Sequence, residues 1–524
     1  MSTFRAATAA VAAAIMISLA GPTSAENVLR WGNANDAFTL DPHSFDHTHT
    51  EELQQQIYET LIGLDSDMSV SGHLAVSWKP LSPTTWQFEL REGVRFHDGT
   101  PFTADDVVFS IQRAKADTSA FKGELESVSE VEAVAPHTVQ ITTAVPNPLL
   151  WETLLRVRIM SESWAERHGV TSPTDFRAGE QTYASDHAHG TGPFVLEEFD
   201  RVGSIVMVRN PGWWGLESYP HNIDRIERVM LADTAAGVQA LLEGRIDFLQ
   251  ELPYDGIDQL ERAPGIRVVR TPWVHTARLG LDQGRAELRS SDINGQNPFK
   301  DRRVRQAMQL AINVETLAEK TLSGLAMPAR MLIPPAVNGF FAEVAEQRLY
   351  DPDRARALLA EAGYPEGFRV ALDCPEAWSL LRDDKVCRAV AAMLGEIGID
   401  VAVNFQPAGP FIEKVAGRQS DFYVYGTEMV LDSQWILDAS LRSDGVENFT
   451  GYANPRVDEL ITASGQQMVT YVRDGLLQEV WRIVTEDVAY IPLYHPMVVW
   501  PMRENLKVPP DPWHRPRFRL ARFQ

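Results

Sequence analysis

The sequence is short of positive charge. It has 48 lysine and arginine residues against 71 aspartate and glutamate residues, so the 524-residue chain carries a formal net charge of −23 at pH 7. A chain this acidic repels phosphate groups, which argues against a nucleic-acid partner. We interpret the acidity as favouring solubility rather than recognition of a basic ligand, because net charge acts on solubility before it acts on binding.

The sequence also lacks the short motifs that mark common hydrolases and nucleotide-binding enzymes. It contains no Gly-x-Ser-x-Gly, no His-Glu-x-x-His and no Gly-x-x-x-x-Gly-Lys segment. These motifs supply an activated serine, a zinc site and a phosphate-binding loop, respectively. The carboxylates show no spacing typical of a paired-acid cleft. We therefore expect no catalytic residue and no cofactor, and a secreted hydrolase is kept only as a remote alternative.

Only two cysteines are present, Cys374 and Cys387. Their spacing is not Cys-x-x-Cys, so a redox motif is not indicated. The N-terminal segment predicts export, and export makes a disulfide chemically permissible. We favour a disulfide over two buried thiols, and closing so short a loop would stabilise the fold by roughly 3 kcal/mol.

One apolar run stands out, within residues 1–25. Arg5 provides a short positive start, Ala6–Ala20 is apolar and rich in small residues, and Thr23-Ser24-Ala25 offers small side chains to a signal peptidase. The run is too short to span a membrane, so we interpret it as a signal peptide cleaved near Ala25. No cysteine follows the run, so no lipid anchor is expected, and the exported protein should be free in a periplasm.

From Val28 onward, short strand-like runs alternate with helical ones. A helix is predicted over 51–61, and a second is predicted to begin at Asp351 and Pro352 and to end at Gly363. Strands are predicted over 85–90, 205–209, 226–231, 266–270, 368–373 and 399–404. This alternation predicts α/β domains, and no internal repeat or low-complexity tract is present.

The block from Phe96 to Val107 can be interpreted physically. Asp98-Gly99 permits a turn with a positive φ, and Pro101 fixes a second dihedral. Thr103 is then a good N-cap, with Asp106 three residues later in the position of a capping box. The block therefore predicts a strand, a turn and a capped helix, and its acidic residues have a structural explanation rather than a catalytic one.

This block, preceded by Leu90-Arg91-Glu92-Gly93-Val94-Arg95, resembles the signature of the family 5 extracellular solute-binding proteins. That family includes peptide-, nickel- and some sugar-binding components of ABC importers. Further segments match in the family's order: Leu40-Asp41-Pro42, Gly190-Thr191-Gly192-Pro193-Phe194, Arg209-Asn210-Pro211 with Trp213-Trp214, Leu242–Asp247, Val304–Ala307, Tyr350-Asp351-Pro352, Asn448–Tyr452, Val457–Ile461 and Ile491–Tyr494. The resemblance spans nearly the whole mature chain.

The resemblance implies a periplasmic-binding-protein-like α/β fold of the type II, cluster C kind. Two lobes are joined by a hinge and close around a ligand in the cleft between them. The implied boundaries are 26–57, 190–270 and 488–524 for the first lobe, 58–189 for an extra domain of that lobe, and 271–487 for the second lobe.

The segment from Asp421 to Trp435 occupies the position of the family's pocket segment. Peptide-binding members usually have a Trp after the Gly, and then an Asp that pairs with the amino terminus of the peptide. Here Thr427 follows Gly426, and the usual Asp position is closest to Val430. This departure argues against an ordinary peptide ligand, and nickel is not supported because the segment contains no histidine.

The candidate ligand-binding residues come from both lobes. The first lobe offers side chains that follow the first strand: Asn33, Asn35, Asp36 and Phe38. The second lobe offers a mixed aromatic, cationic and acidic set: Trp378, Arg382, Tyr425, Thr427, Glu428, Asp432 and Trp435. The resemblance implies that Arg382 lies in the segment where peptide-binding members of the family have an arginine that binds the ligand carboxylate. The alternatives are that Tyr425 and Trp435 belong to a core and that Arg382 forms a surface ion pair.

Three histidines, His43, His47 and His49, lie close together in the sequence with Asp41 and Asp46. These residue types can bind a metal. No second cluster completes a ligand set, since His187 and His189 are distant, so we interpret these histidines as structural or solvated and expect no metal site.

The sequence therefore predicts the periplasmic substrate-binding component of an ABC importer. Its expected partners are a small polar solute and the transmembrane subunits of the permease, and we expect a monomer. A short peptide or modified amino acid is the preferred solute, and a sugar, sugar conjugate, opine-like compound or metal chelate is the alternative. A solute sensor that signals to a receptor would share the same fold.

Overall fold

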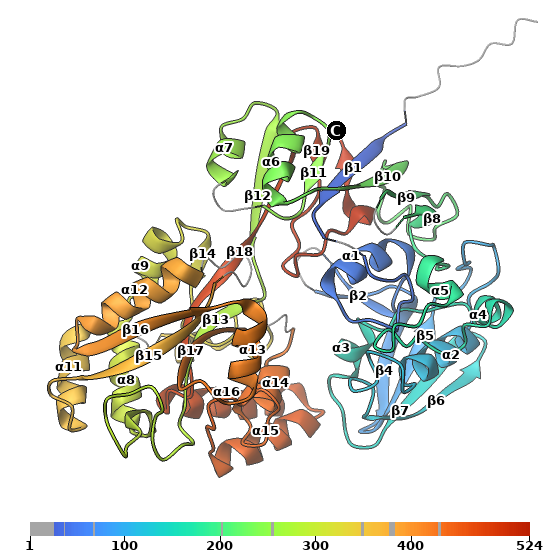
Figure 1. Cartoon of the computed structure of the whole chain (residues 1–524). Coiled ribbons are helices and arrows are strands. Elements are labelled where there is room, and N and C mark those ends of the chain that lie inside the picture. Colours follow the sequence, from blue (N-terminus) through green and yellow to red (C-terminus); the bar gives the residue numbers. More distant parts are fainter. Residues whose placement is uncertain are drawn as a thin grey trace, which may run out of the picture.

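The computed structural model describes residues 26–35, 37–65, 69–200, 203–252, 256–346, 350–376, 383–427 and 431–524. Its elements form two bodies with a further group of strands above the space between them (Figure 1). We call the body built from residues 276–494 lobe 2. We call the other body, together with the further group of strands, lobe 1; it is built from residues 26–272 and 497–524.

One 12-stranded sheet extends through both lobes. Its main path, in spatial order, is β16 (Ile399–Gln406), β15 (Phe368–Pro375), β17 (Phe422–Thr427), β13 (Thr276–Leu281), β18 (Ile491–Arg503), β11 (Phe248–Leu249), β1 (Val28–Asn33), β10 (Arg225–Met230), β9 (Ile205–Arg209) and β8 (Phe194–Phe199). Strands β12 (Ile266–Pro272) and β14 (Ala326–Pro328) also pair with β18. The sheet is therefore common to both lobes, and β18 is the strand at which they meet.

Two segments of the chain cross between the lobes. The 13-residue strand β18 pairs with β13 in lobe 2 and then with β12 and β11 in lobe 1. The second crossing is the link from β12 to β13, where Trp273 N–H donates to the carbonyl of Pro496 at 2.8 Å. Thr276 Oγ1 lies 2.9 Å from His495 Nδ1. The two crossings are hydrogen-bonded to each other at this point, and we call residues 272–276 and 494–497 the hinge.

Lobe 1 contains a separate four-stranded antiparallel sheet with its own core. Its order is β4 (Ala75–Ser82), β5 (Thr85–Leu90), β7 (Thr138–Thr143) and β6 (Val128–Ala135), and the hairpin of β2 (Ile62–Leu64) and β3 (Val70–Gly72) lies beside it. Helix α2 (Ala104–Ala114) buries Val107 and Ile111 in this core. Thr103 N–H donates to Asp106 Oδ2 at 2.9 Å, which completes the predicted capping box, and Gly99 has the predicted positive φ of 85°.

The remaining helices of lobe 1 lie around the four-stranded sheet and the lobe 1 part of the 12-stranded sheet. They are α1 (Thr48–Ile57), α3 (Leu150–Leu154), α4 (Glu162–His168), α5 (Tyr183–Asp186), α6 (Thr234–Leu242) and α7 (Ile257–Glu261). The chain ends in the short pair β19 (Leu506–Lys507) and β20 (Arg522–Phe523), which lies against the first strand's core through Phe518.

Lobe 2 is covered by helices α8 (Arg302–Ala311), α9 (Val314–Thr316), α10 (Ala342–Ala345), α11 (Pro352–Glu361), α12 (Asp383–Gly395), α13 (Ala408–Ala416), α14 (Ser433–Ile436), α15 (Pro455–Gln466) and α16 (Thr470–Glu486). Asp351 caps α11 by accepting from Arg354 N–H, with Pro352 in the first turn, as predicted. Cys374 at the end of β15 and Cys387 in α12 form the expected disulfide. The bond ties a helix to the sheet that it covers.

The six predicted strands are all present, and the bounds of β5 and β9 are those predicted. The helix predicted over 51–61 is wrong at both ends, because α1 begins at Thr48 and stops at Ile57. The chain is extended at Tyr58, and the Ile57 carbonyl accepts from Gly192 N–H at 2.9 Å instead of continuing the helix. Within the described residues, no helix has the length and apolar character needed to cross a membrane.

Candidate functional site

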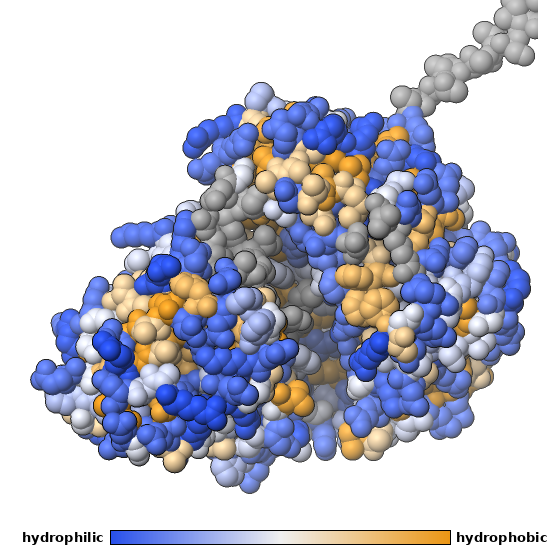
Figure 2. Space-filling view, viewed as in Figure 1, coloured by the Kyte–Doolittle hydropathy of each residue, from blue (hydrophilic) through white to orange (hydrophobic). Residues whose placement is uncertain are grey.

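A crevice separates the two lobes below the crossing strands, as Figure 2 shows. Contacts across it include Glu152 of α3, whose Oε1 accepts from the backbone N–H groups of Leu431 and Asp432 at 3.1 and 3.2 Å. Met468 of lobe 2 packs against the core of the four-stranded sheet in lobe 1. Because both lobes present side chains to this crevice and a hinge lies above it, the crevice is the candidate site.

Asn33 ends strand β1 and is fully buried. Its Nδ2 donates to Gln250 Oε1 at 3.3 Å, and its Oδ1 accepts from Asn35 N–H at 2.8 Å. The Asn35 carbonyl in turn accepts from Arg228. The polar atoms of Asn33 are therefore used within lobe 1, where they fix the course of the chain after β1.

Phe38 follows this turn and keeps 38% of its surface exposed. Its ring centroid lies 5.3 Å from Phe45, 4.9 Å from His47 and 6.2 Å from Phe176. The four rings form an aromatic cluster, and Phe45 and His47 were not among the predicted ligand residues. An aromatic side chain that is supported by other rings and left partly exposed suits contact with an apolar part of a ligand. Asp36 lies outside the described residues.

His49 lies between two carboxylates of lobe 1, 3.3 Å from Glu52 and 3.4 Å from Glu251. Burial lowers its pKa, but the hydrogen bond and charge of Glu52 outweigh burial, so the pKa of His49 is raised. Burial lowers the pKa of His43 to about 3, and its Nε2 bonds the Arg158 carbonyl. Among the described residues, no group of three or more His, Cys, Asp or Glu side chains is arranged to hold a metal.

Tyr425 of β17 is half-buried in lobe 2. Its ring lies 5.7 Å from that of Phe449 and 5.9 Å from the guanidinium of Arg278. Gly426 follows, and a Cβ at this position would lie 2.3 Å from His275 Nε2 in the hinge. Glycine therefore lets β17 pass close to the hinge, and this places residues 425–427 beside it. Thr427 ends the strand, and its side chain lies outside the part of the structure that is described.

Asp432 is fully buried at the start of α14. Its carboxylate forms a bidentate pair with Arg473, at 2.9 and 2.6 Å, and accepts from Asn338 Nδ2 and from Gln434 N–H. Both carboxylate oxygens are therefore engaged within lobe 2. The backbone N–H of Asp432, in contrast, donates across the crevice to Glu152.

Trp435, in α14, is 43% exposed, so it does not belong to the core of lobe 2. Trp378, Arg382 and Glu428 lie outside the described residues. The structure therefore places Tyr425, Asp432 and Trp435 in lobe 2 and Asn33, Asn35 and Phe38 in lobe 1.

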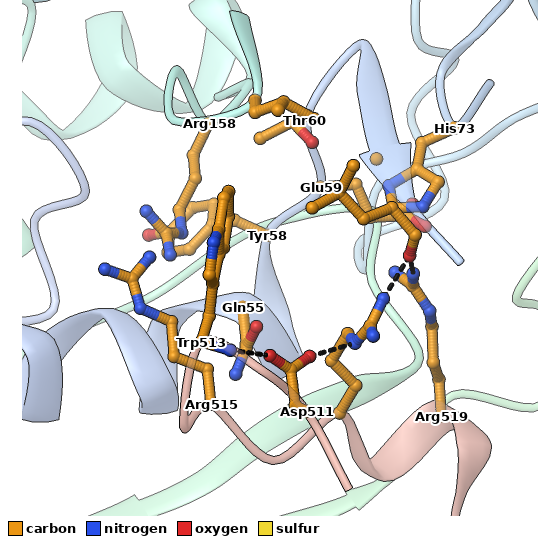
Figure 3. A pocket seen from close by; sticks show the side chains of 14 residues that line it. Gln55, Tyr58, Glu59, Thr60, His73, Arg158, Asp511, Trp513, Arg515 and Arg519 are labelled. Carbon is orange, nitrogen blue, oxygen red and sulfur yellow. Dashed lines mark hydrogen bonds and ion pairs between the residues drawn. The ribbon is translucent and has the colours of Figure 1, made fainter. Parts of the chain in front are cut away.

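Sequence reasoning missed a cavity of about 80 Å³ in lobe 1, shown in Figure 3. Its walls come from α1 and the residues after it, from the β2–β3 hairpin and the residue after it, from the segment after α3, and from the C-terminal segment. The lining residues are Gln55, Tyr58, Glu59, Thr60, Gly63, Leu64, His73, Leu155, Arg158, Asp511, Trp513, Arg515, Arg517 and Arg519. The three arginines within residues 515–519 were a usable signal, because they concentrate positive charge in one short segment of an otherwise acidic chain.

The family model described as bacterial extracellular solute-binding proteins, family 5 Middle, matches residues 69–448, more than half of the chain. The chain belongs to this family.

Similar proteins agree with this assignment. The glutathione-binding protein GsiB of Shigella flexneri is 26% identical over 485 residues, 89% of each chain. HbpA2 from Haemophilus parasuis has a TM-score of 0.82 at 22% identity, covering 95% of this chain and 100% of its own. DppA from Helicobacter pylori, in complex with the peptide STSA, has a TM-score of 0.71 at 21% identity, covering 94% and 98%.

As a family 5 solute-binding protein of the ABC-importer type, the chain has the two-lobed fold that the sequence predicted. The exact domain boundaries and the ligand-binding residues named from the sequence stay predictions.

Proposed function

We propose that this family 5 protein is the periplasmic substrate-binding component of an ABC importer, which captures a small polar solute and delivers it to the transmembrane subunits of the permease. The observation that carries the proposal is the paired crossing at residues 272–276 and 494–497 above the crevice between the lobes. Rotation about two adjacent segments closes one lobe on the other without breaking either core. The closed form buries the solute and presents a new surface to the permease.

A short peptide or modified amino acid is the proposed solute. Two similar proteins support this class by their names, one as a glutathione-binding protein and one as a complex with a peptide. The partly exposed rings of Phe38 and Trp435 suit the apolar parts of such a molecule. A sugar, sugar conjugate or opine-like compound is the alternative that the pocket segment around Thr427 keeps open.

The predicted ligand residues divide into two roles. We assign contact with solute to the residues that are not fully buried or whose side chains lie beyond the described part of the chain: Asn35, Asp36, Phe38, Trp378, Arg382, Tyr425, Thr427, Glu428 and Trp435. Asn33 and Asp432 instead hold neighbouring backbone in place, because their side-chain polar atoms are engaged within their own lobes.

The proposal includes export to the periplasm, cleavage near Ala25, and a monomer that binds without turnover. Mass spectrometry of the purified protein would define the mature N-terminus and any ligand that it releases on denaturation. A thermal-shift screen of peptides, glutathione, opines and sugar conjugates would follow. A solute present at 100 times its dissociation constant should add about 2.7 kcal/mol of stability. Absence of any released or stabilising solute, with no compaction by X-ray scattering, would refute the proposal.

Substitution of exposed aromatic residues tests the crevice as the site. Phe38→Ala and Trp435→Ala are each expected to weaken solute binding roughly ten-fold, the scale of about 1.4 kcal/mol for one well-placed aromatic contact. Tyr350→Ala is the matched control, because Tyr350 is 44% exposed and precedes α11 at the outer side of lobe 2 (Figure 1). Equal affinity in all three variants would move the site away from the crevice.

A further inference from the structure

The cavity in lobe 1 concentrates positive charge. Four arginines line it, Arg158, Arg515, Arg517 and Arg519, against two carboxylates, Glu59 and Asp511. Figure 3 shows the guanidinium groups of Arg158 and Arg515 directed toward each other on one side of the cavity, with Arg519 on the opposite side.

Both carboxylates of the cavity already have partners. Asp511 Oδ2 lies 2.6 Å from Arg517 Nε, and its Oδ1 accepts from Trp513 N–H at 2.7 Å. Glu59 accepts from the indole N–H groups of Trp213 and Trp214, at 3.0 and 2.9 Å, and from Thr191 Oγ1 at 2.8 Å. Burial raises the pKa of Glu59, so this carboxyl contributes less negative charge than an exposed one would.

Arg515 forms an ion pair with Glu51, and Arg517 forms one with Asp511. The other two arginines have weaker compensation. Within the described ranges, no carboxylate lies at ion-pair distance from Arg158 or Arg519, and their hydrogen bonds in the structure go to the carbonyls of Glu51 and Leu64. Burial lowers the pKa of each of these guanidinium groups to about 10. The negative charges of Glu51 and Glu59 act on Arg158 and Arg519, respectively, from beyond ion-pair distance. A buried cation that is only partly compensated is destabilising, so the cavity favours the entry of an anion.

His73 supplies a further polar atom at the same wall. It is 5% exposed, and its Nε2 has no hydrogen-bond partner among the described residues. Burial and the charges of Arg519 and Arg517 lower its pKa well below the usual value, so the ring is neutral at neutral pH. A neutral imidazole N–H can donate to an anionic oxygen, and this atom has no other use in the structure.

The walls of the cavity adjoin the crevice between the lobes. Leu155 follows α3 directly, and Glu152 of that helix contacts lobe 2. Trp513, on another wall, packs against the core of lobe 2 that includes Val274 of the hinge. The volume of about 80 Å³ holds roughly five to eight waters at 10–15 Å³ each, which suits a terminal group and not a whole solute.

We propose that this arginine cavity receives an anionic group of the solute, a carboxylate or a phosphate, and so restricts the transported class to acidic molecules. Arg158 and Arg519 neutralise the anion from opposite walls, and His73 donates a hydrogen bond to it. This inference rests on the proposed function, because it assigns one end of the same ligand site.

Glutathione and its diethyl ester are matched probes that differ in their two carboxylates, and inorganic phosphate is a probe without a peptide. Isothermal titration with the wild-type protein is expected to show at least ten-fold tighter binding of glutathione than of its ester. Inorganic phosphate should raise the melting temperature above that in chloride at equal ionic strength. Stabilisation by phosphate without preference for the acid would assign the cavity to a free phosphate ion and would overturn its role in solute selection.

Variants test whether Arg158 and Arg519 cause the preference for the acid over the ester. Arg519→Gln and Arg158→Gln should each lose most of the preference for the acid, while Arg519→Lys keeps part of it. Arg209→Gln is the matched control, since Arg209 is a lobe 1 arginine that donates to the His221 carbonyl and pairs with Asp224 outside the cavity. A preference that survives both glutamine variants would overturn the inference.

The two proposals fail in different ways. If another solute from the thermal-shift screen binds and compacts the protein, but its acidic form and its ester bind equally, the transport function stands and the arginine cavity has no part in selection. If no solute of any class binds, the proposed function itself fails. Wild-type measurements decide both outcomes even when a variant does not fold.

Discussion

The pair of Asp432 and Arg473 gives the sharpest prediction about the second lobe. Arg473→Met removes a guanidinium that is 4% exposed and makes two hydrogen bonds to a carboxylate that is fully buried. Methionine fills much of the same volume, so the main change is the loss of charge. Asp432 would keep Asn338 and the Gln434 N–H, but its negative charge would have no counter-ion.

The expected loss follows from that geometry. Removing one partner of a buried, hydrogen-bonded ion pair costs about 3–5 kcal/mol, because the remaining charge is left uncompensated. For a folding unit of 150–250 residues, each kcal/mol lowers the melting temperature by about 2–4 °C, so we expect a decrease of roughly 6–20 °C. The double variant Asp432→Asn/Arg473→Met should recover part of the loss, because it leaves no buried charge.

Calorimetry and urea unfolding followed by near-ultraviolet circular dichroism measure the effect. Arg442→Met is the control, because Arg442 pairs with Asp438 and Asp444 at the surface of the same lobe and should change stability by less than about 1 kcal/mol. A loss below 1 kcal/mol for Arg473→Met would refute the reasoning. So would weaker solute binding by the double variant at unchanged stability, since Asp432 would then act on the ligand directly.

Three further predictions concern the disulfide, the contact between the lobes and the helix cap. Reduction of Cys374–Cys387, which are 13 positions apart, should lower stability by roughly 3 kcal/mol, and equal unfolding of the oxidised and fully reduced protein would contradict this. Burial and the neighbouring charge of Asp432 raise the pKa of Glu152 from 4.5 to about 8, so its contact with lobe 2 should be strongest below about pH 4.5 and weaken as the pH rises through 8. The charge of Arg473 also acts on Glu152. X-ray scattering of the wild-type protein and of Glu152→Gln should therefore be compared from pH 5 to 9, and the variant should lose the pH dependence of compactness. An identical pH profile in both proteins would exclude Glu152 as the source of that dependence. Thr103→Ala should cost about 1 kcal/mol by thermal unfolding while Thr103→Ser costs little, and equal losses would show that the hydroxyl is not what matters.

Much of the fold was predictable because its signals are local. The bounds of β5 follow from the alternation of Trp86, Phe88 and Leu90, whose side chains are buried on one face. The start of α11 follows from Asp351 and Pro352, which need only the next turn of helix to act. The end of α1 was missed because it depends on Gly192, a residue distant in sequence whose N–H binds the Ile57 carbonyl.

The candidate site was less predictable for the same reason. Asp432 has the chemistry of a ligand residue in the sequence, and only the structure shows that Arg473, 41 positions away, engages its carboxylate. Phe38 was identified because it follows the first strand directly. The arginine cavity was missed although its three alternating arginines are visible in the sequence, because their meaning depends on the residues of α1 and the β2–β3 hairpin that they face.

The walls of that cavity have a consequence for folding during the proposed export. Arg517 donates to the Leu64 carbonyl, a contact between residues 453 positions apart. Contacts of such long range form late, because the entropy of closing the intervening chain must be overcome first. A chain that emerges from a membrane N-terminus first holds residues 55–73 outside long before residues 511–519 arrive. Because the cavity needs both segments, the proposed capture of an anionic solute there can occur only after translocation and folding are complete.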